Sequence, residues 1–212
     1  MKLLIAAAAA VVTLVPSPPG TVVQNVGVSF NAETSSHAWR AIASKEPLGS
    51  SGGREFYQWN LSIYGLRGGS YRLRYKSPGN GGPLSRVAQA NGAAMWFPIQ
   101  DLRIVGTASL MHSGVEQLVV QSHEMAADCG MATVSIFATT VGATVGRTVF
   151  ASNLCDLSAR IVHGSGGDSI ELTGPYYGAN APACCPTKAH ATAELRYANG
   201  KWVETPLYFK LN

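Results

Sequence analysis

Hydrophobic and polar residues alternate with a period of two along much of this chain, which is the pattern of strands with one buried face. In residues 71–76 (YRLRYK) the odd positions are aromatic or aliphatic and the even positions are basic. Residues 57–63 alternate in the same way, and glycines within 65–69 supply a turn between the two runs. The pattern predicts an antiparallel pair of strands, with Tyr71, Leu73 and Tyr75 on one face and Arg72, Arg74 and Lys76 on the other.

The same alternation recurs through the second half of the chain. Two runs flank a glycine-containing turn at 139–143, and an Asn199-Gly200 pair stands between two further runs. Asn-Gly between alternating runs is typical of a type I′ hairpin, because both residues accept a positive φ. The strands predicted in this half cover residues 131–138, 144–153, 157–161, 194–197, 201–204 and 207–211.

One segment, Ser35–Glu46, has the spacing of a helix instead. The hydrophobic residues Trp39, Ile42 and Ala43 share a face at helical spacing. Pro47 would end such a helix. We therefore predict one short N-terminal helix in a chain that is otherwise built of strands.

Strands at short spacing predict a mainly β fold. The expected architecture is an antiparallel β-sandwich or barrel-like sheets, with that one short helix and a disulfide-stapled C-terminal half. A chain of this size is enough for one domain or two small ones. We expect an N-terminal β-rich region at 21–98 and a C-terminal disulfide-containing β region at 99–212, or one continuous domain over 21–212.

The first 20 residues have the three parts of a secretory signal peptide. Lys2 supplies a positive charge, residues 3–15 are almost entirely hydrophobic, and a segment rich in proline, serine and glycine follows. The hydrophobic run is shorter than the roughly 20 residues of an ordinary membrane span. We expect a signal peptide at 1–20 and a periplasmic or secreted protein with no membrane span in the mature chain. An uncleaved anchor or a buried strand is the alternative.

Composition narrows the class of partner. Charged residues make up only 13% of the chain, and glycine (23) and proline (11) are abundant, which suits a turn-rich β protein outside the cell. The formal net charge of +4 falls to +3 without Lys2. So small an excess does not support nucleic acid as a partner, which would need a clustered basic patch.

All four cysteines lie in the last 84 residues, and their even number predicts disulfides formed outside the cytosol. Cys129 and Cys155 are equidistant from Gly142 in the predicted turn, so a regular hairpin would place them opposite each other within disulfide range. That pairing leaves the neighbours Cys184 and Cys185 as a strained vicinal disulfide. In the competing schemes each of the first two cysteines joins one member of that pair.

The adjacent cysteines follow Gly174–Tyr177, lie within Ala183–Thr187 (ACCPT) and precede a predicted strand at 191–197. This arrangement resembles the tail of uncharacterised bacterial exported proteins and lipoproteins. In that group a Cys-Cys-Pro-Ser/Thr motif follows a tyrosine-containing loop and precedes a strand and an Asn/Asp-Gly turn. The resemblance implies a location in the bacterial cell envelope or outside the cell and carries no known activity. The chain departs from many members because it lacks a lipid-attachment cysteine.

Potential metal ligands and acid–base groups gather between His123 and Cys129. A metalloprotease H-E-x-x-H helix would need histidine at position 127, where the chain has alanine. His112, His123 and Asp128 are the best remaining candidates for a hydrolytic site, and a polar loop between strands is the alternative interpretation. We therefore assign no catalytic residue, no metal and no cofactor.

Aromatic residues near the cysteine loop form the predicted binding site. The rings of Tyr176, Tyr177 and Trp202 suit stacking on a sugar or a peptide. The cations at 72, 74 and 76 would suit an acidic glycan or anionic lipid headgroups, or would simply be solvated. The sequence favours an exported bacterial structural or binding module without catalytic activity, whose partner is a cell-envelope glycan or protein. A secreted hydrolase and a thiol-redox protein acting through Cys184-Cys185 are the alternatives.

Overall fold

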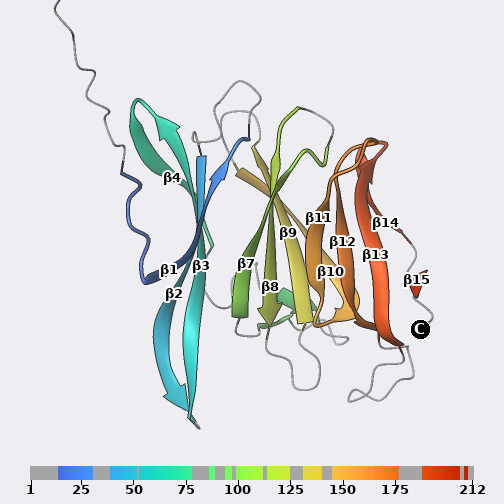
Figure 1. Cartoon of the computed structure of the whole chain (residues 1–212). Helices are drawn as coiled ribbons and strands as arrows, with labels where there is room; N and C mark the ends of the chain where they lie inside the picture. Colours follow the sequence, from blue (N-terminus) through green and yellow to red (C-terminus); the bar gives the residue numbers. More distant parts are fainter. Residues whose placement is uncertain are drawn as a thin grey trace, which may run out of the picture.

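The computed structural model shows a mainly β protein whose described residues form antiparallel strands and no helix (Figure 1). This confirms the mainly β part of the predicted fold class. The structure describes residues 14–30, 39–51, 53–77, 86–88, 94–96, 99–111, 114–124, 131–139, 145–176, 188–205 and 208–209.

The first sheet is an antiparallel meander in which neighbouring strands follow one another along the chain. The strand that contains residues 57–63 does pair antiparallel with residues 71–76, as predicted, although the contact runs through residues 62–67. Gly68 and Gly69, both with positive φ, form the turn between these strands. The strands of this sheet are β1 (Thr21–Val28), β2 (Trp39–Ser51), β3 (Arg54–Arg67) and β4 (Ser70–Lys76).

The second sheet has the strand order β14-β13-β12-β10-β9-β8-β7, with β11 paired to β12 and β15 paired to β13. A separate two-stranded ribbon joins β5 (Arg86–Ala88) to β6 (Ala94–Trp96). The strands of the second sheet are β7 (Ile99–Ala108), β8 (Gln117–Glu124), β9 (Met131–Thr139), β10 (Val145–Cys155), β11 (Ser158–Val162), β12 (Ser169–Tyr176), β13 (Lys188–Ala198), β14 (Lys201–Glu204) and β15 (Tyr208–Phe209).

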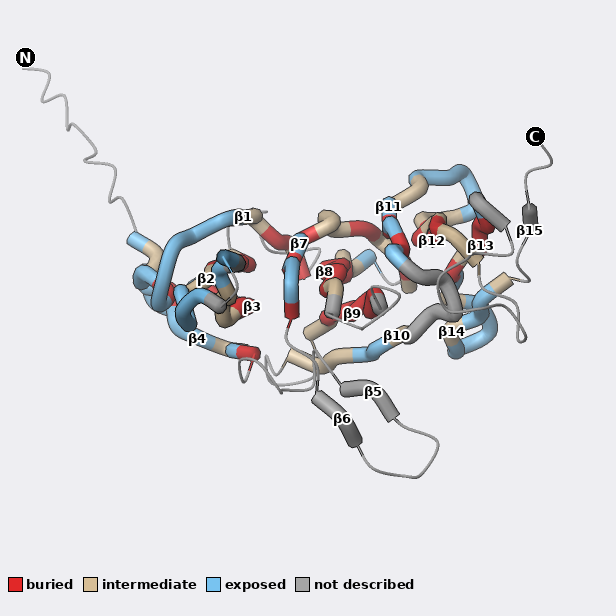
Figure 2. The backbone as a smooth tube through the Cα atoms, turned by 90° about the horizontal axis from the view of Figure 1, so that it is seen from below, coloured by how far each residue is buried: buried red, intermediate tan, exposed pale blue. Residues whose placement is uncertain are grey.

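The strands stack in three layers, with β7–β9 in the middle (Figure 1). One hydrophobic cluster joins the first sheet to the middle layer and includes Trp59, Leu61 and Phe137. A second cluster joins the opposite face of the middle layer to β11–β13 and includes Ile136 and Leu172. Figure 2 shows the buried residues concentrated along these two contacts. The first cluster combines residues from both sides of position 98, so the two predicted regions share a core.

Strand β8, at the centre of the middle layer, is buried on both faces. In β8, Leu118 and Val120 belong to the cluster facing the first sheet, whereas Val119 between them belongs to the cluster facing the third layer. Consecutive hydrophobic residues are expected in such a strand, because the side chains on both of its faces are shielded from water. For this reason β8 lacks the alternation that predicted the outer strands.

The predicted helix at Ser35–Glu46 is wrong over its described part, because residues 39–46 belong to β2. Trp39 and Ala43 pack in the cluster toward the middle layer, and Ile42 packs on the outer face against Tyr64 and Tyr71. Hydrophobic residues on both faces of a strand imitated the spacing of a helix. Residues 35–38 lie outside the described part of the chain.

The predicted facing of Tyr71–Lys76 is also wrong, because a β-bulge interrupts β4. Tyr75 lies opposite Ile63, but Leu73 lies opposite the next residue, Tyr64, so Arg74 is the extra residue. Tyr71 therefore packs in the outer cluster, whereas Tyr75 packs toward the middle layer. The same bulge divides the expected basic stripe between the two faces of the sheet.

The β9–β10 hairpin has the register predicted from its midpoint at Gly142. Thr139 lies opposite Val145 and Thr133 opposite Ala151, as that midpoint requires. A bulge then shifts the register, so that Cys155 lies opposite Met131 and not opposite position 129. At the same place β10 leaves β9 and pairs with β12 through Leu154 and Tyr176. A bulge that bends a strand from one layer into the next is a known corner device of sheet packings.

The disulfide-stapled tail stays a prediction. Cys129, Cys184 and Cys185 lie outside the described residues, and only the backbone of Cys155 is described. The shifted register nonetheless removes the backbone alignment on which a direct Cys129–Cys155 pairing was predicted.

The Asn-Gly hairpin near the C-terminus is confirmed. Ala198 lies opposite Lys201, and the two residues between them, Asn199 and Gly200, have φ values of 51° and 78°. These positive values are those of the type I′ turn that the sequence predicted. Of the predicted final strand, Tyr208–Phe209 forms β15, and residues 207 and 211 lie outside the described part.

Candidate functional site

A polar pocket opens on the third layer where the loop between β11 and β12 meets the end of β13. Its volume is about 390 Å³, within the range of small-molecule sites. The loop contributes Gly164–Asp168 and the strands contribute charged side chains. The lining residues are Val162, Gly164, Ser165, Gly166, Gly167, Asp168, Ser169, Glu194, Arg196, Tyr197 and Ala198.

Asp168 holds the loop of this pocket in place. One of its carboxylate oxygens accepts a hydrogen bond from the backbone N–H of Ser109 at 2.9 Å. The other lies 3.0 Å from Nδ1 of His163, whose side chain is largely exposed. The carboxylate therefore ties the loop to the end of β7 and orients the imidazole at its rim.

Glu194 is the second carboxylate of the pocket and is fixed from three directions. Its Oε1 accepts hydrogen bonds from the Ser169 hydroxyl at 2.5 Å and from the Arg196 guanidinium at 2.8 Å. Its backbone N–H donates to the hydroxyl of Thr205. The hydrogen bond from Arg196 lowers the pKa of Glu194, the Ser169 hydroxyl lowers it further, and partial burial offsets part of the effect. Glu194 is therefore ionised at neutral pH.

The chemistry of these groups suits binding better than hydrolysis. A glycosidase uses a pair of carboxyl groups, one of which must have a raised pKa to donate a proton. Here the pKa of Glu194 is lowered, and both oxygens of Asp168 already have partners. The pocket instead presents acceptors, a guanidinium and hydroxyls in fixed positions.

The predicted aromatic site is not assembled in the structure. Tyr176 lies at one end of the β12–β13 pair, opposite Lys188, and Trp202 lies beside Tyr197 near the other end. Tyr197 follows Lys188 by nine positions along β13, which is about 30 Å of strand. Tyr177 lies outside the described residues.

Trp202 belongs to an aromatic cluster that borders the pocket. Its ring makes edge-to-face contacts with Phe150 at 5.4 Å and with Tyr197 at 5.2 Å between centroids. Tyr197 also lines the pocket. The contacts fix Tyr197 in place, so Trp202 acts on the site through its neighbour.

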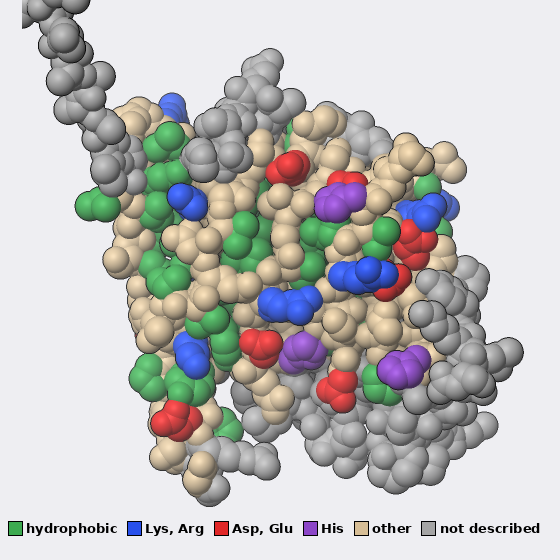
Figure 3. All heavy atoms as spheres, viewed as in Figure 1, with side chains coloured by type: hydrophobic (Ala, Val, Ile, Leu, Met, Phe, Trp, Pro, Cys, Tyr) green, Lys and Arg blue, Asp and Glu red, His purple; other side chains and the backbone are tan. Residues whose placement is uncertain are grey.

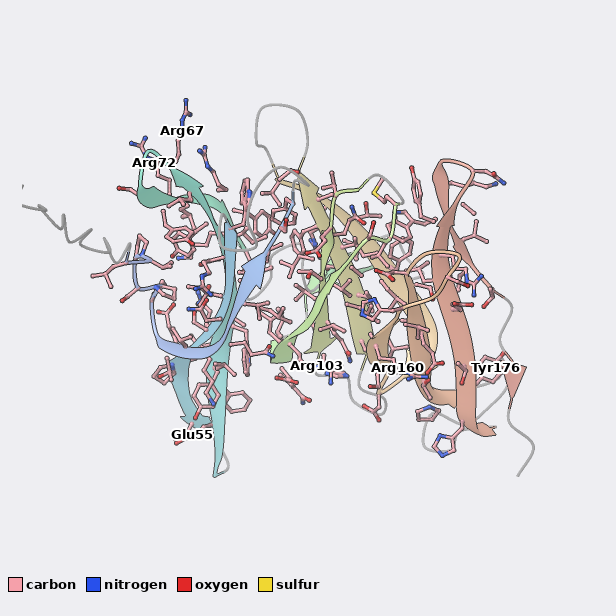
Figure 4. All side chains as sticks on the ribbon, turned by 45° about the horizontal axis from the view of Figure 1, so that its top comes forward. Glu55, Arg67, Arg72, Arg103, Arg160 and Tyr176 are labelled. Carbon is pink, nitrogen blue, oxygen red and sulfur yellow. The ribbon has the colours of Figure 1, made fainter. Side chains whose placement is uncertain are left out.

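Side chains from the middle layer complete the free edge of β11. Among the described strands, this one pairs only with β12, on one of its two edges. At the other edge, the Gln121 side chain accepts a hydrogen bond from the Ala159 N–H at 3.0 Å and donates one to the Leu157 carbonyl. Arg103 donates to the Ala159 carbonyl at 2.7 Å, and Figure 4 shows Arg103 reaching from β7 toward β11. The edge is thereby closed without another strand.

His123 also takes part in this edge. Its Nε2 lies 3.0 Å from the Leu157 carbonyl oxygen, and its Nδ1 lies 3.9 Å from Asp101. The other two residues of the hydrolytic hypothesis, His112 and Asp128, lie outside the described part of the chain. Within the described residues, no group of three His, Cys, Asp or Glu side chains is placed to hold a metal ion.

Sequence reasoning missed the residues of the pocket. Glu194 and Arg196 have the spacing of the solvated face of a strand, and Asp168 closes a loop rich in glycine and serine. The available signal was that loop, His163–Asp168 (HGSGGD), placed between two predicted strands. It identifies a place where backbone amides and short polar side chains gather.

Comparisons of the chain with protein-family models, with curated proteins and with solved structures find no match. Among the described residues, a search for helices with the length and hydrophobicity needed to cross a membrane finds none.

Proposed function

We propose that this protein is an exported bacterial binding module, without catalytic activity of its own, that holds a hydroxyl-rich ligand in the pocket beside β13. The observation that carries the proposal is the fixed polar lining, in which Glu194, Arg196 and Ser169 are joined by hydrogen bonds. A site of this kind binds without having to order flexible side chains first.

The ligand class that fits best is a neutral glycan of the cell envelope. The pocket combines two carboxylates with a guanidinium and an imidazole, so no single sign of charge dominates. Sugar hydroxyls donate to carboxylates and accept from guanidinium, which satisfies both kinds of group. Figure 3 shows acidic, basic and histidine side chains close together over the half of the molecule that carries the third layer.

Export is supported by the N-terminal hydrophobic run and by the four cysteines of the second half. The resemblance of Ala183–Thr187 and its flanks to bacterial exported proteins supports the same location. We propose a signal peptide at 1–20, a periplasmic or secreted mature protein, and disulfides among Cys129, Cys155, Cys184 and Cys185.

Isothermal titration calorimetry with soluble peptidoglycan fragments and neutral oligosaccharides tests the proposal. Arg196→Ala should weaken binding about tenfold or more, since loss of a charged hydrogen bond corresponds to about 1.5–3 kcal/mol. Arg160→Ala is the matched control, because Arg160 is an equally exposed arginine paired with Glu171 on the same layer but outside the pocket.

Equal affinities of Arg196→Ala and Arg160→Ala would contradict the assignment of the pocket. Cleavage of a bound oligosaccharide, followed by mass spectrometry, would contradict the proposal of a non-catalytic module. Failure of the wild type to bind any member of the panel would overturn the glycan class.

A further inference from the structure

The turn between β3 and β4 presents leucines to solvent on the outer face of the first sheet. Leu66 is 42% exposed and Leu73 is 50% exposed, although each lies next to a buried tyrosine of the outer cluster. Leu66 lies opposite Tyr71 and Leu73 lies opposite Tyr64 across the two strands. Large hydrophobic side chains that continue a buried cluster into solvent are typical of an interaction surface.

Basic residues alternate with these leucines at the hairpin end and lie on its other face, where Arg72 is opposite Gly65. Residues 66–76 contain four basic residues and no acidic one. Arg67 and Arg72 are both exposed, and Figure 4 shows them extending from the end of β4 away from the body of the molecule. Within the described residues, no ion pair includes either of them. The hairpin end therefore combines exposed leucines with unneutralised positive charge.

The N-terminal hydrophobic run reaches the folded part of the chain at this same face. Val15 packs against Ile42, Tyr64 and Tyr71, and Leu14 before it is 81% exposed. Residues 3–15 form the hydrophobic run. In the precursor, before the proposed signal peptide is removed, the residues that precede the first sheet therefore lie on its outer face.

We propose that the β3–β4 hairpin end is a docking surface for an anionic lipid bilayer. Leu66 and Leu73 enter the boundary between headgroups and acyl chains, and Arg67 and Arg72 bind lipid phosphates. The positive charge of the hairpin end, beside exposed leucines, points to anionic lipid as the occupant. The docking surface lies on the first sheet, and the ligand pocket lies on the third layer.

Co-sedimentation of the full chain with vesicles of phosphatidylcholine, with and without 30% phosphatidylglycerol, tests this proposal. We expect binding to the anionic vesicles that falls about 25-fold in Arg67→Gln/Arg72→Gln, at about fivefold per cation. Leu66→Ser/Leu73→Ser should lower binding about tenfold. Arg160→Gln/Lys201→Gln removes the same charge from the third layer and should leave binding unchanged, as should Val149→Ser at another exposed hydrophobic position. Circular dichroism checks that each variant is folded.

Several results would overturn the proposal. Equal binding to both kinds of vesicle, or an equal loss in the two charge variants, would show that the hairpin end does not recognise anionic lipid. Absence of vesicle binding by the wild type would do the same. Binding to heparin that depends on Arg67 and Arg72, without binding to vesicles, would assign the surface to acidic glycans instead.

Discussion

The free edge of β11 offers the sharpest test of how the third layer is held to the middle one. Gln121, only 2% exposed, forms two hydrogen bonds with the backbone of this edge. Leucine has a similar size and no polar atoms, so Gln121→Leu removes both hydrogen bonds while the space stays filled. The Nε2 of His123 still lies 3.0 Å from the Leu157 carbonyl oxygen, but the Ala159 N–H loses its partner.

The expected cost follows from that one orphaned donor. A buried N–H left without a partner costs about 1–3 kcal/mol. Ala159 is fully buried, so water does not replace the lost acceptor unless the edge opens. We therefore expect the free energy of unfolding to fall by about 2 kcal/mol, which corresponds to a drop of about 4–8 °C in Tm for a chain of this size.

Urea unfolding followed by circular dichroism measures this change as a shift in midpoint at constant slope. Gln100→Leu is the matched control, because Gln100 is an exposed glutamine on neighbouring β7 and its replacement should change stability by less than about 0.5 kcal/mol. If Gln121→Leu were as stable as Gln100→Leu, the side-chain closure of the β11 edge would not contribute to stability and the reasoning would be refuted.

Two further predictions concern a buried hydroxyl and the cysteines. Burial raises the pKa of Tyr75, and the charge of Arg147 partly offsets this effect. Above about pH 10 the tyrosine of the unfolded state therefore loses a proton that the folded state keeps, and the free energy of unfolding falls as pH rises. Tyr75→Phe should flatten this alkaline loss and be neutral or about 1 kcal/mol more stable at pH 8, because the buried Tyr75 hydroxyl has no hydrogen-bond partner among the described residues. Parallel losses of urea midpoint in both proteins between pH 8 and 10.5 would count against this prediction. Leu154 lies opposite Tyr176, which lies opposite Lys188, so the segment 177–187 begins and ends beside Cys155. Mass spectrometry of a non-reduced digest should find Cys155 and Cys129 each joined to one of Cys184 and Cys185, and a peptide linking Cys129 only to Cys155 would contradict this.

Local turn chemistry made the hairpins of the outer layers predictable. Asn199-Gly200 specifies its turn because two consecutive positive φ values strongly favour this pair. The midpoint of the β9–β10 hairpin predicted its register until the bulge after Ala151. The bulge lies where β10 begins to pair with β12, which is distant in the sequence. No local sequence signal shows this long-range pairing.

Strands β8 and β2 were not predictable from periodicity, for a shared reason. Alternation of hydrophobic and polar residues indicates a strand only when one face of that strand is exposed to water. Leu118–Val120 contacts hydrophobic neighbours on both sides, and Ile42 packs outward while Ala41 and Ala43 pack inward. Burial on both faces therefore removed the signal from β8 and imitated a helix in β2.

The candidate pocket was hidden because its residues are ordinary in their local context. Glu194 and Arg196 alternate with buried residues, as solvated residues do on any exposed strand. What makes them a site is the loop that Asp168 ties to Ser109, 59 residues earlier in the chain. A tertiary hydrogen bond of this kind depends on how the layers stack, so it cannot be predicted from the spacing of residues in the sequence.

The layered order gives the two proposed surfaces a physical relation. The docking surface belongs to the first sheet and the pocket to the third layer, and the middle layer stands between them with a hydrophobic cluster on each of its faces (Figure 1). Docking of Leu66 and Leu73 on a bilayer would therefore leave Glu194 and Arg196 on the side of the molecule that is turned away from the lipid. In that orientation a membrane-bound copy of the protein keeps its pocket open to ligands of the surrounding envelope, and neither surface competes with the other for the same residues.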